Sequence, residues 1–152
     1  MSNIKITSPS ENEIHQLVSL CAAHAAFEKC DYQTKGKADR MSKDLFSTNP
    51  KLHCRVAAND GQYIGYITWM KQYSTWDAKE YLYMDCLYLD SDYRSQGIGV
   101  ELINEMKIFG IKNGVSIIQW QTPDFNERAI KFYRKIGAVS LSKERFFLNV
   151  NS

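Results

Sequence analysis

The chain has 152 residues, a net charge of +2 and 44% hydrophobic residues, which suits one domain over residues 2–152 and excludes an intrinsically disordered chain. The charge is too small to favour a nucleic-acid binder, and no apolar run approaches the ~20 residues that a membrane-spanning helix needs. The four cysteines and three histidines are scattered without a Cys-x-x-Cys pair, so we expect reduced cytoplasmic thiols and no metal site. The N-terminal residues lack the apolar stretch of a signal peptide.

The first half of the chain contains helical patterns followed by strand patterns. Residues 2–7 alternate apolar and polar side chains, as a half-buried strand does. The sequence Ser10-x-x-Glu13 is a capping box and predicts that a helix opens there. Asn59-Asp60-Gly61 is typical of a tight hairpin turn. The elements that we expect are a strand over 2–7, a helix from Ser10 onward, a helix over about 37–47, and strands over 53–58 and 63–73.

The second half alternates strands and helices. Apolar residues at Ile98, Leu102, Met106 and Phe109 predict a helix that ends at about Asn113. The expected elements are a strand over 79–89, this helix, a strand over 115–121, a helix over about 126–136 and a last strand over 146–150. The order is βααβββαβαβ, and alternation after residue 80 implies one parallel strand pair in a mostly antiparallel sheet. The predicted class is therefore mixed α/β, with helices flanking the sheet.

The turn from Arg94 to Gly99 joins an apolar strand to a helix and contains two glycines, Gly97 and Gly99. A helix N-terminus exposes free N–H groups that favour an anion, and glycine lets the backbone approach a ligand closely. The turn could therefore bind phosphate or pyrophosphate. Two glycines could also simply make a tight turn. Leu102 replaces the third glycine of a dinucleotide fingerprint, and no Gly-Lys-Ser/Thr follows, so neither common nucleotide loop is present.

Two spaced motifs give the chain a resemblance to a known family. One is Arg94-x-x-Gly97-x-Gly99, and the other is Asn126-x-x-Ala129-x-x-Phe132-Tyr133-x-x-x-Gly137-Ala138. In this order they resemble the GNAT N-acetyltransferases over nearly the whole chain. With Phe27-Glu28 and Asp85 included, the resemblance is closest to the diamine or polyamine (spermidine/spermine) branch.

This resemblance implies the GNAT fold and acetyl-CoA as the co-substrate, without a metal. Two central parallel strands, here residues 81–89 and 115–121, would splay apart, and the pantetheine arm would lie between them. The residues that would contact acetyl-CoA are Leu87, Tyr88 and Leu89 on the strand, Arg94, Ser95, Gln96, Gly97, Ile98 and Gly99 in the turn, and Asn126, Ala129 and Phe132 on the later helix.

Asp85 is the first candidate for acid–base chemistry. Acetyl transfer needs a neutral amine, but an alkylamine with a pKa near ~10.4 arrives as ammonium at neutral pH. Asp85 lies in an apolar strand between Met84 and Cys86, and its carboxylate could take the proton directly or through water. It could also be a solvent-facing strand residue, since alternation places it with Tyr83 and Leu87. The polyamine branch carries a glutamate here, so the shorter aspartate favours a water relay.

Four further interpretations concern single residues or small groups. Tyr133 matches the family tyrosine that gives a proton to the CoA sulfur, although periodicity alone would place it in a helix core. Asn126 matches the residue that binds the pantetheine arm, and it could also be a helix N-cap. Cys86 could form an acyl-enzyme, but small apolar filler is the simpler role. The side chains that we expect to frame the acceptor site are Glu28, Tyr32, Trp76 and Tyr83.

Together these observations favour an acetyl-CoA-dependent N-acetyltransferase that acts on a primary amine of a small, polyamine-like or other cationic molecule. Transfer would be direct, in a ternary complex. The alternatives are transfer to a protein or peptide amine, transfer to an aminoglycoside-type antibiotic, and a non-catalytic acetyl-CoA-binding module. We expect no nucleic-acid or membrane partner, and we keep a homodimer as an open expectation.

Overall fold

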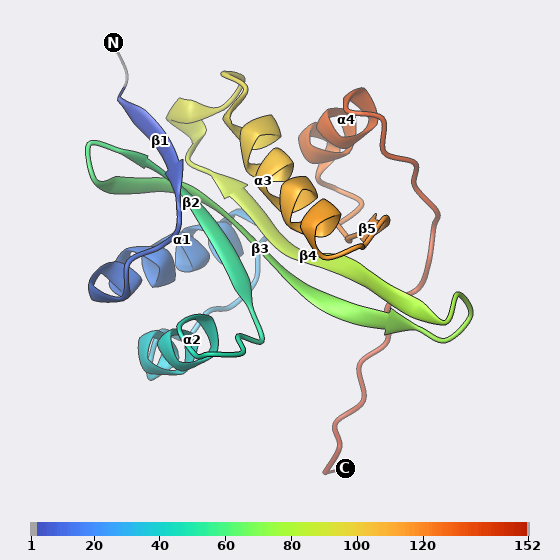
Figure 1. Ribbon diagram of the computed structural model, residues 1–152. Coiled ribbons are helices and arrows are strands. Elements are labelled where there is room, and N and C mark those ends of the chain that lie inside the picture. Colours follow the sequence, from blue (N-terminus) through green and yellow to red (C-terminus); the bar gives the residue numbers. More distant parts are fainter. Residues whose placement is uncertain (1–2, 152) are drawn as a thin grey trace. The chain divides into compact units, whose positions relative to one another are not determined.

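The computed structural model describes residues 3–151, which form two compact units (Figure 1). The first unit extends to Gln121, and the second begins at Thr122. The single domain expected over residues 2–152 stays a prediction.

The first unit is built on a five-stranded mixed sheet in the order β1-β2-β3-β4-β5. The first four strands pair antiparallel, and β5 runs parallel to β4. The strands are β1 (Ile4–Thr7), β2 (His53–Asn59), β3 (Gln62–Ser74), β4 (Lys79–Leu89) and β5 (Ile118–Gln119). This confirms the prediction of a mixed sheet with one parallel pair.

Helices cover both faces of this sheet. The helices α1 (Ile14–Phe27) and α2 (Lys37–Leu45) lie on one face, and α3 (Ile98–Lys112) lies on the other (Figure 1). Because side chains alternate along a strand, Tyr66 of β3 joins the apolar core under α1, while Trp69 of the same strand contacts Phe109 of α3. The face under α1 and α2 is the one that matters for the site described below.

The start of α1 differs from the prediction in its chemistry. A short 3-10 turn over Glu11–Glu13 precedes the helix, and Ser10 makes no side-chain cap. Instead, the backbone N–H of Ser10 donates to the hydroxyl of Tyr63 at 2.9 Å. The capping-box prediction was therefore right about the helix and wrong about the cap, because a contact with β3 takes the place of the local one.

The predicted hairpin between β2 and β3 is confirmed. Asp60 and Gly61 have φ angles of 49° and 86°, the left-handed pair that a two-residue hairpin turn requires. At the other end of β3, residues 75–78 form the turn into β4. The Asp60–Gly61 turn is a local signal, and it places Asn59 of β2 opposite Gln62 of β3.

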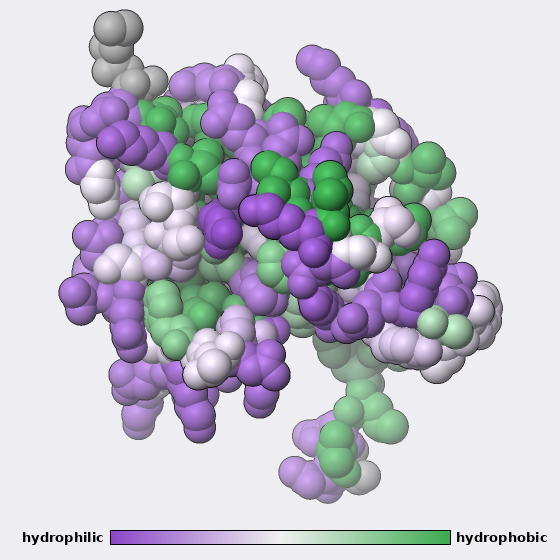
Figure 2. All heavy atoms as spheres, in the orientation of Figure 1, coloured by the Kyte–Doolittle hydropathy of each residue, from purple (hydrophilic) through white to green (hydrophobic). Residues whose placement is uncertain are grey.

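The second unit contains α4 (Glu127–Lys135) and, in the described residues 136–151, no strand. The strand predicted over 146–150 was wrong, since Phe146, Phe147, Leu148 and Val150 are 81–93% exposed. Apolar side chains of this segment are visible on the surface in Figure 2. A strand needs a paired neighbour, and an apolar pattern alone does not supply one. For the same reason β5 is two residues long, rather than extending over 115–121.

Candidate active site

The turn before α3 has the backbone that the glycine pattern predicts. Gly97 is the N-cap of α3 with a φ of 84°, and it has no side chain to accept from the first N–H groups. A Cβ built on Gly97 meets no heavy atom within 4 Å, so the space in front of the turn is open. Ser95 also has a positive φ, 64°. The geometry leaves an uncapped helix N-terminus facing open space, which suits an anion.

Arg94 is held at the end of β4, where the turn begins. Its Nε donates to the carbonyl oxygen of Leu89 at 2.8 Å. The guanidinium carbon lies 4.7 Å from the ring centroid of Phe27 and 5.6 Å from that of Tyr88. These contacts fix a positive charge between the C-terminal end of α1 and the end of β4. Leu89 was predicted to contact acetyl-CoA, and its carbonyl oxygen is an acceptor for Arg94.

One edge of β4 loses its partner strand part-way along. The parallel pairing with β5 covers Leu82 with Ile118 and Tyr83 with Gln119. From Met84 to Leu89, the structure of residues 3–151 pairs β4 with β3 alone. Leu87, Tyr88 and Leu89 therefore lie along a stretch of β4 whose second edge has no paired strand. The short pairing agrees with strands that part after Tyr83.

Asp85 occupies a β-bulge in β4. Thr68 pairs with Cys86 and Trp69 pairs with Met84, so Asp85 has no residue opposite it on β3. A bulge re-aims the side chains beside it. As a result, Asp85 and Cys86 line the same pocket although they are neighbours in sequence, where strict alternation predicted opposite faces. The bulge explains how an exposed carboxylate fits in an apolar strand.

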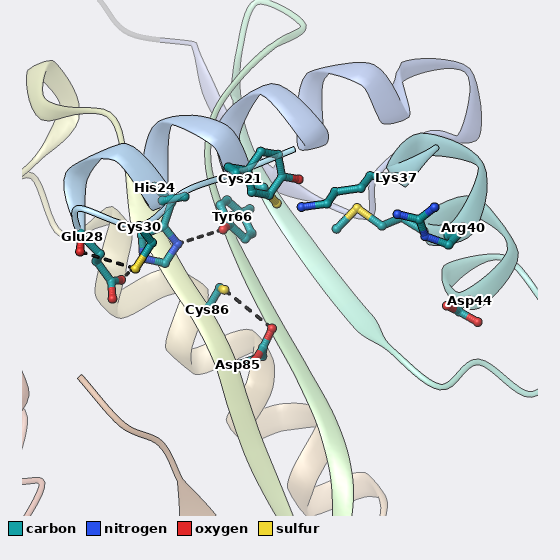
Figure 3. A pocket seen from close by; sticks show the side chains of 13 residues that line it. Cys21, His24, Glu28, Cys30, Lys37, Arg40, Asp44, Tyr66, Asp85 and Cys86 are labelled. Carbon is teal, nitrogen blue, oxygen red and sulfur yellow. Dashed lines mark hydrogen bonds and ion pairs between the residues drawn. The ribbon is translucent and has the colours of Figure 1, made fainter. Parts of the chain in front are cut away.

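This pocket, with a volume of about 560 Å³, lies against α1, α2, β3 and β4 (Figure 3). Three residues predicted from sequence line it: Glu28, Tyr32 and Asp85. Sequence reasoning missed the other polar residues of its wall, of which the most informative are His24, Lys37, Arg40, Asp44 and Tyr66. The volume falls in the range of small-molecule sites, roughly 300–1,000 Å³.

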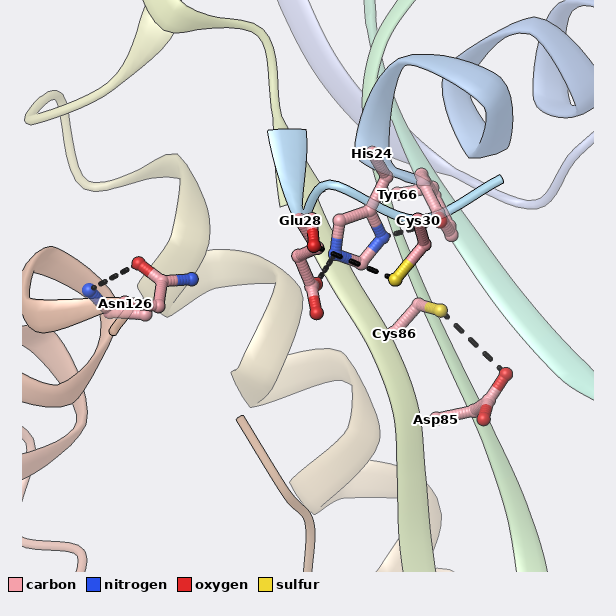
Figure 4. A network of polar contacts seen from close by, with 8 residues as sticks. His24, Glu28, Cys30, Tyr66, Asp85, Cys86 and Asn126 are labelled. Atoms are coloured by element: carbon pink, nitrogen blue, oxygen red, sulfur yellow. Dashed lines mark hydrogen bonds and ion pairs between the residues drawn. The ribbon is translucent and has the colours of Figure 1, made fainter. Parts of the chain in front are cut away.

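A chain of polar contacts fixes Glu28 at one end of the pocket (Figure 4). His24 Nε2 contacts the Glu28 carboxylate one helical turn away, and His24 Nδ1 lies 2.9 Å from the hydroxyl of Tyr66. The imidazole also stacks on Tyr88, with ring centroids 5.2 Å apart. Both ring nitrogens are engaged, so His24 orients the Glu28 carboxylate. The i,i+4 spacing of His24 and Glu28 was the sequence feature that could have revealed this pair.

The thiols of Cys21 and Cys86, which line the pocket, are poor nucleophiles. Burial, followed by the charge of Asp85, raises the pKa of the Cys86 thiol to about 12. The Cys86 Sγ donates to Asp85 Oδ2 at 3.6 Å, which requires the protonated thiol. Burial also raises the pKa of Cys21. A thiolate is the reactive form of cysteine, so this environment disfavours an acyl-enzyme on Cys86 and agrees with its interpretation as filler.

Two predicted rim residues lie elsewhere. Trp76 lies in the turn between β3 and β4 and is 97% exposed, and neither it nor Tyr83 lines the pocket. The seven residues from Lys79 to Asp85 span about 20 Å of extended strand, which separates the hairpin tip from the pocket within this unit. The aromatic side chains that the pocket does contain are Tyr32 and Tyr66.

In the described part of the chain, no group of three His, Cys, Asp or Glu side chains could hold a metal ion. None of the helices within residues 3–151 combines the length and the apolar character that a membrane crossing requires.

Comparison with known proteins decides the family. The model of the acetyltransferase (GNAT) family matches residues 13–138. The chain belongs to this family. The match takes in α1, the Asp85 bulge, the Gly97 turn and α4, and so it runs through both compact units.

Several GNAT-type proteins resemble the chain over most of its length. The thialysine N-epsilon-acetyltransferase of Mus musculus is 27% identical, over 98% of this chain and 92% of its own length. That of Bos taurus is 28% identical, over 94% of this chain and 88% of its own length. A solved aminoglycoside N-acetyltransferase in complex with CoA is 15% identical, with a TM-score of 0.82, over 99% of this chain and 97% of that chain. The last comparison shows that the fold is that of GNAT acetyltransferases.

The remaining residues of the GNAT-like pattern lie on or beside α4. The Oδ1 atom of Asn126 accepts from the backbone N–H of Ala129 at 3.3 Å, which confirms the N-cap interpretation. Phe132 and Tyr133 are half-buried neighbours with ring centroids 5.5 Å apart. The helix ends where Ala138 N–H donates to the carbonyl of Tyr133 at 3.0 Å and Gly137 takes a φ of 96°. The proposed acid and the proposed pantetheine contact thus share one short, capped helix.

Proposed function

We propose that the chain is an acetyl-CoA-dependent N-acetyltransferase whose acceptor is a primary amine of a small molecule. The observation that carries this proposal is the pocket into which the β4 bulge directs Asp85 and the His24 contact directs Glu28. The carboxylates of Asp85 and Glu28, two of the three that line this pocket, suit a cationic amine. The names of the mouse and cattle relatives place their transfer on the N-epsilon atom of thialysine, which supports a small amine acceptor here.

The residues of the first unit fit acetyl-CoA. The pyrophosphate would accept from the N–H groups of the turn from Arg94 to Gly99, because Gly97 leaves the helix start uncapped and the space before it open. The pantetheine arm would run along the unpaired edge of β4 at Leu87 and Tyr88. Asn126, Ala129 and Phe132 would complete the contact from α4, as the family pattern predicts.

The transfer would proceed by direct attack. Asp85 takes a proton from the bound ammonium, directly or through water, and the freed nitrogen attacks the thioester carbonyl carbon. The C–N bond forms, the C–S bond breaks, and the departing sulfur accepts a proton from the Tyr133 hydroxyl. The nitrogen releases its second proton to solvent as the amide forms, and solvent returns a proton to the Tyr133 oxygen. The raised pKa of Cys86 supports this ternary mechanism over an acyl-enzyme. Homodimer formation stays a prediction.

The Asp85→Asn variant tests the role of the bulge residue. If the carboxylate removes the proton, kcat/KM should fall, and the deficit should shrink as pH rises, because a larger share of the amine is then already neutral. The measurement is CoA release over a panel of small amines, from neutral pH upward. Glu80→Gln is the matched control, since Glu80 is exposed on the same strand and does not line the pocket.

Two results would count against this assignment. A loss in Asp85→Asn that is equal at every pH would make Asp85 a binding or structural residue. A larger loss in Glu80→Gln than in Asp85→Asn would move the base away from the pocket.

A further inference from the structure

The pocket also contains two cations that the transfer chemistry does not require. Lys37 and Arg40 lie on the first turns of α2, whereas the carboxylates of Glu28 and Asp85 come from the end of α1 and from β4. In Figure 3 the two cations lie on the α2 side of the pocket, with Glu28 on the opposite side. The wall is therefore charged at both ends with opposite signs.

The cations are held in place without being neutralised. The Nζ atom of Lys37 lies 3.4 Å from the ring centroid of Tyr32, and Arg40 Nη2 donates to the carbonyl of Lys35 at 3.4 Å. Among the described residues 3–151, neither Lys37 nor Arg40 forms an ion pair with an acidic side chain. Asp44 also lines this end of the pocket, as a single carboxylate near two cations.

Local backbone geometry positions Arg40. Gly36, the N-cap of α2, has a φ of 73°, and a Cβ at this position would lie 2.7 Å from Arg40 Nη1. The guanidinium therefore packs against the chain at Gly36, where a side chain would displace it. Positive φ and close approach together favour glycine here.

Cys21 also lines the pocket, and in Figure 3 it lies between Glu28 on one side and Lys37 on the other. An acceptor lying across Cys21 would therefore meet a carboxylate and an ammonium within one small site.

A purely cationic acceptor does not suit this distribution. One ammonium of a diamine could meet Asp85 and Glu28, but the other would lie toward Lys37 and Arg40 and be repelled. An acceptor that carries a carboxylate would instead gain charge-assisted hydrogen bonds, which Arg in particular makes in pairs.

Resting on the proposed function, we propose that Lys37 and Arg40 are specificity residues that select an acceptor with a carboxylate. The side-chain amine of a diamino acid would face Asp85 and Glu28, and its α-carboxylate would face Lys37 and Arg40. The acetyl group goes to the amine at the far end from that carboxylate.

Matched pairs of acceptors test this directly. Lysine and cadaverine differ by one carboxylate, as do ornithine and putrescine. With the full-length enzyme and acetyl-CoA, kcat/KM for each amino acid should exceed that for its diamine by at least about tenfold, the scale of one charge-assisted contact. Mass spectrometry of the lysine product should place the acetyl group on the side-chain nitrogen.

Substitutions on α2 should reduce the preference for each amino acid over its diamine. Lys37→Met and Arg40→Met should raise KM for lysine about tenfold each and should raise turnover of cadaverine, since a repelling charge is gone. Lys37→Arg keeps the charge and should retain most of the preference. Lys43→Met is the control, because Lys43 is exposed on the same helix outside the pocket, and it should leave both acceptors unaffected. Thermal melting of each variant checks the fold.

The results of these assays distinguish the diamino-acid assignment from the acetyltransferase function. Faster transfer to the diamines, or a preference that persists in both Met variants, would overturn the diamino-acid assignment while the acetyltransferase function stands. Turnover of aminoglycosides or peptides with none of the four small amines would do the same. Absence of transfer to every amine in the panel would overturn the proposed function itself.

Discussion

The N-terminal ends of α3 and α4 differ in whether a side chain caps the helix. Every α-helix begins with N–H groups that lack an intrahelical partner. At α4, the side chain of Asn126 accepts from Ala129 N–H at 3.3 Å. At α3, the N-cap is Gly97, which offers no side chain, and open space lies in front of it. One helix start is closed by its own residue, and the other is left open.

This difference suits the two helices to different functions, anion binding for α3 and catalysis for α4. An uncapped start retains its attraction for an anion, while a capped start has part of that capacity satisfied internally. We therefore expect α3 to contribute binding of the acetyl-CoA pyrophosphate and α4 to contribute the chemistry of Tyr133. Substitutions in α3 and α4 should therefore change the affinity for acetyl-CoA and the turnover number separately.

The largest expected effect is on turnover, through α4. Tyr133→Phe should lower kcat about 100-fold, because a general acid contributes roughly that much, and it should leave the dissociation constant of acetyl-CoA nearly unchanged. Only the hydroxyl is lost, and it acts once charge develops on sulfur. Steady-state kinetics and calorimetry supply the two numbers. Tyr73→Phe, at an exposed position of β3, should alter neither.

Wild-type turnover in Tyr133→Phe would return this tyrosine to a packing role on α4. A parallel loss of acetyl-CoA affinity would show that α4 also contributes binding, and the division between the two helices would fail.

The next largest effect should be on the affinity for acetyl-CoA, through α3. Gly97→Asn should raise the dissociation constant of acetyl-CoA at least about tenfold, because the new side chain enters the space that phosphate needs. Asn tolerates a positive φ better than other residues with side chains, so the fold should survive. Gly97→Asp should bind more weakly still, because its carboxylate repels phosphate, and salt should narrow the gap between the two variants. At saturating acetyl-CoA, kcat should stay near that of the unaltered enzyme.

Near-normal affinity in a folded Gly97→Asp variant would exclude this helix start as the pyrophosphate site. An affinity difference between Asp and Asn that does not respond to salt would point to shape rather than charge.

Both helix starts could be predicted from the sequence, because caps and glycine turns depend on neighbouring residues. The same holds for the Asp60–Gly61 hairpin. The strand predicted over 146–150 failed because pairing requires a partner that a local pattern does not reveal. The bulge at Asp85 was missed for a similar reason, since a bulge is defined by the register against β3.

The pocket shows the same limit. Asp85 and Glu28 were predicted as carboxylates of the acceptor site and do line the pocket, but Lys37 and Arg40 were not singled out. They belong to an amphipathic helix, where charged residues usually face solvent. Their place in the pocket is set only when α2 packs beside α1 and brings them to the same wall as Asp85.

The smallest effect should follow from opening the closed helix start. Asn126→Ala removes the acceptor for Ala129 N–H and should lower the free energy of unfolding by about 1 kcal/mol, the usual cost of losing a cap. If Asn126 also contacts the pantetheine arm, the dissociation constant of acetyl-CoA should rise as well. Urea unfolding and calorimetry measure the two quantities on the same sample. Asn126→Ser distinguishes the roles, because serine still caps a helix but has no amide to reach the ligand. If Asn126→Ser restores the stability but not the affinity for acetyl-CoA, Asn126 acts both as a helix cap and as a ligand contact. Recovery of both would make Asn126 a cap alone, and loss of affinity in neither variant would remove it from the binding site.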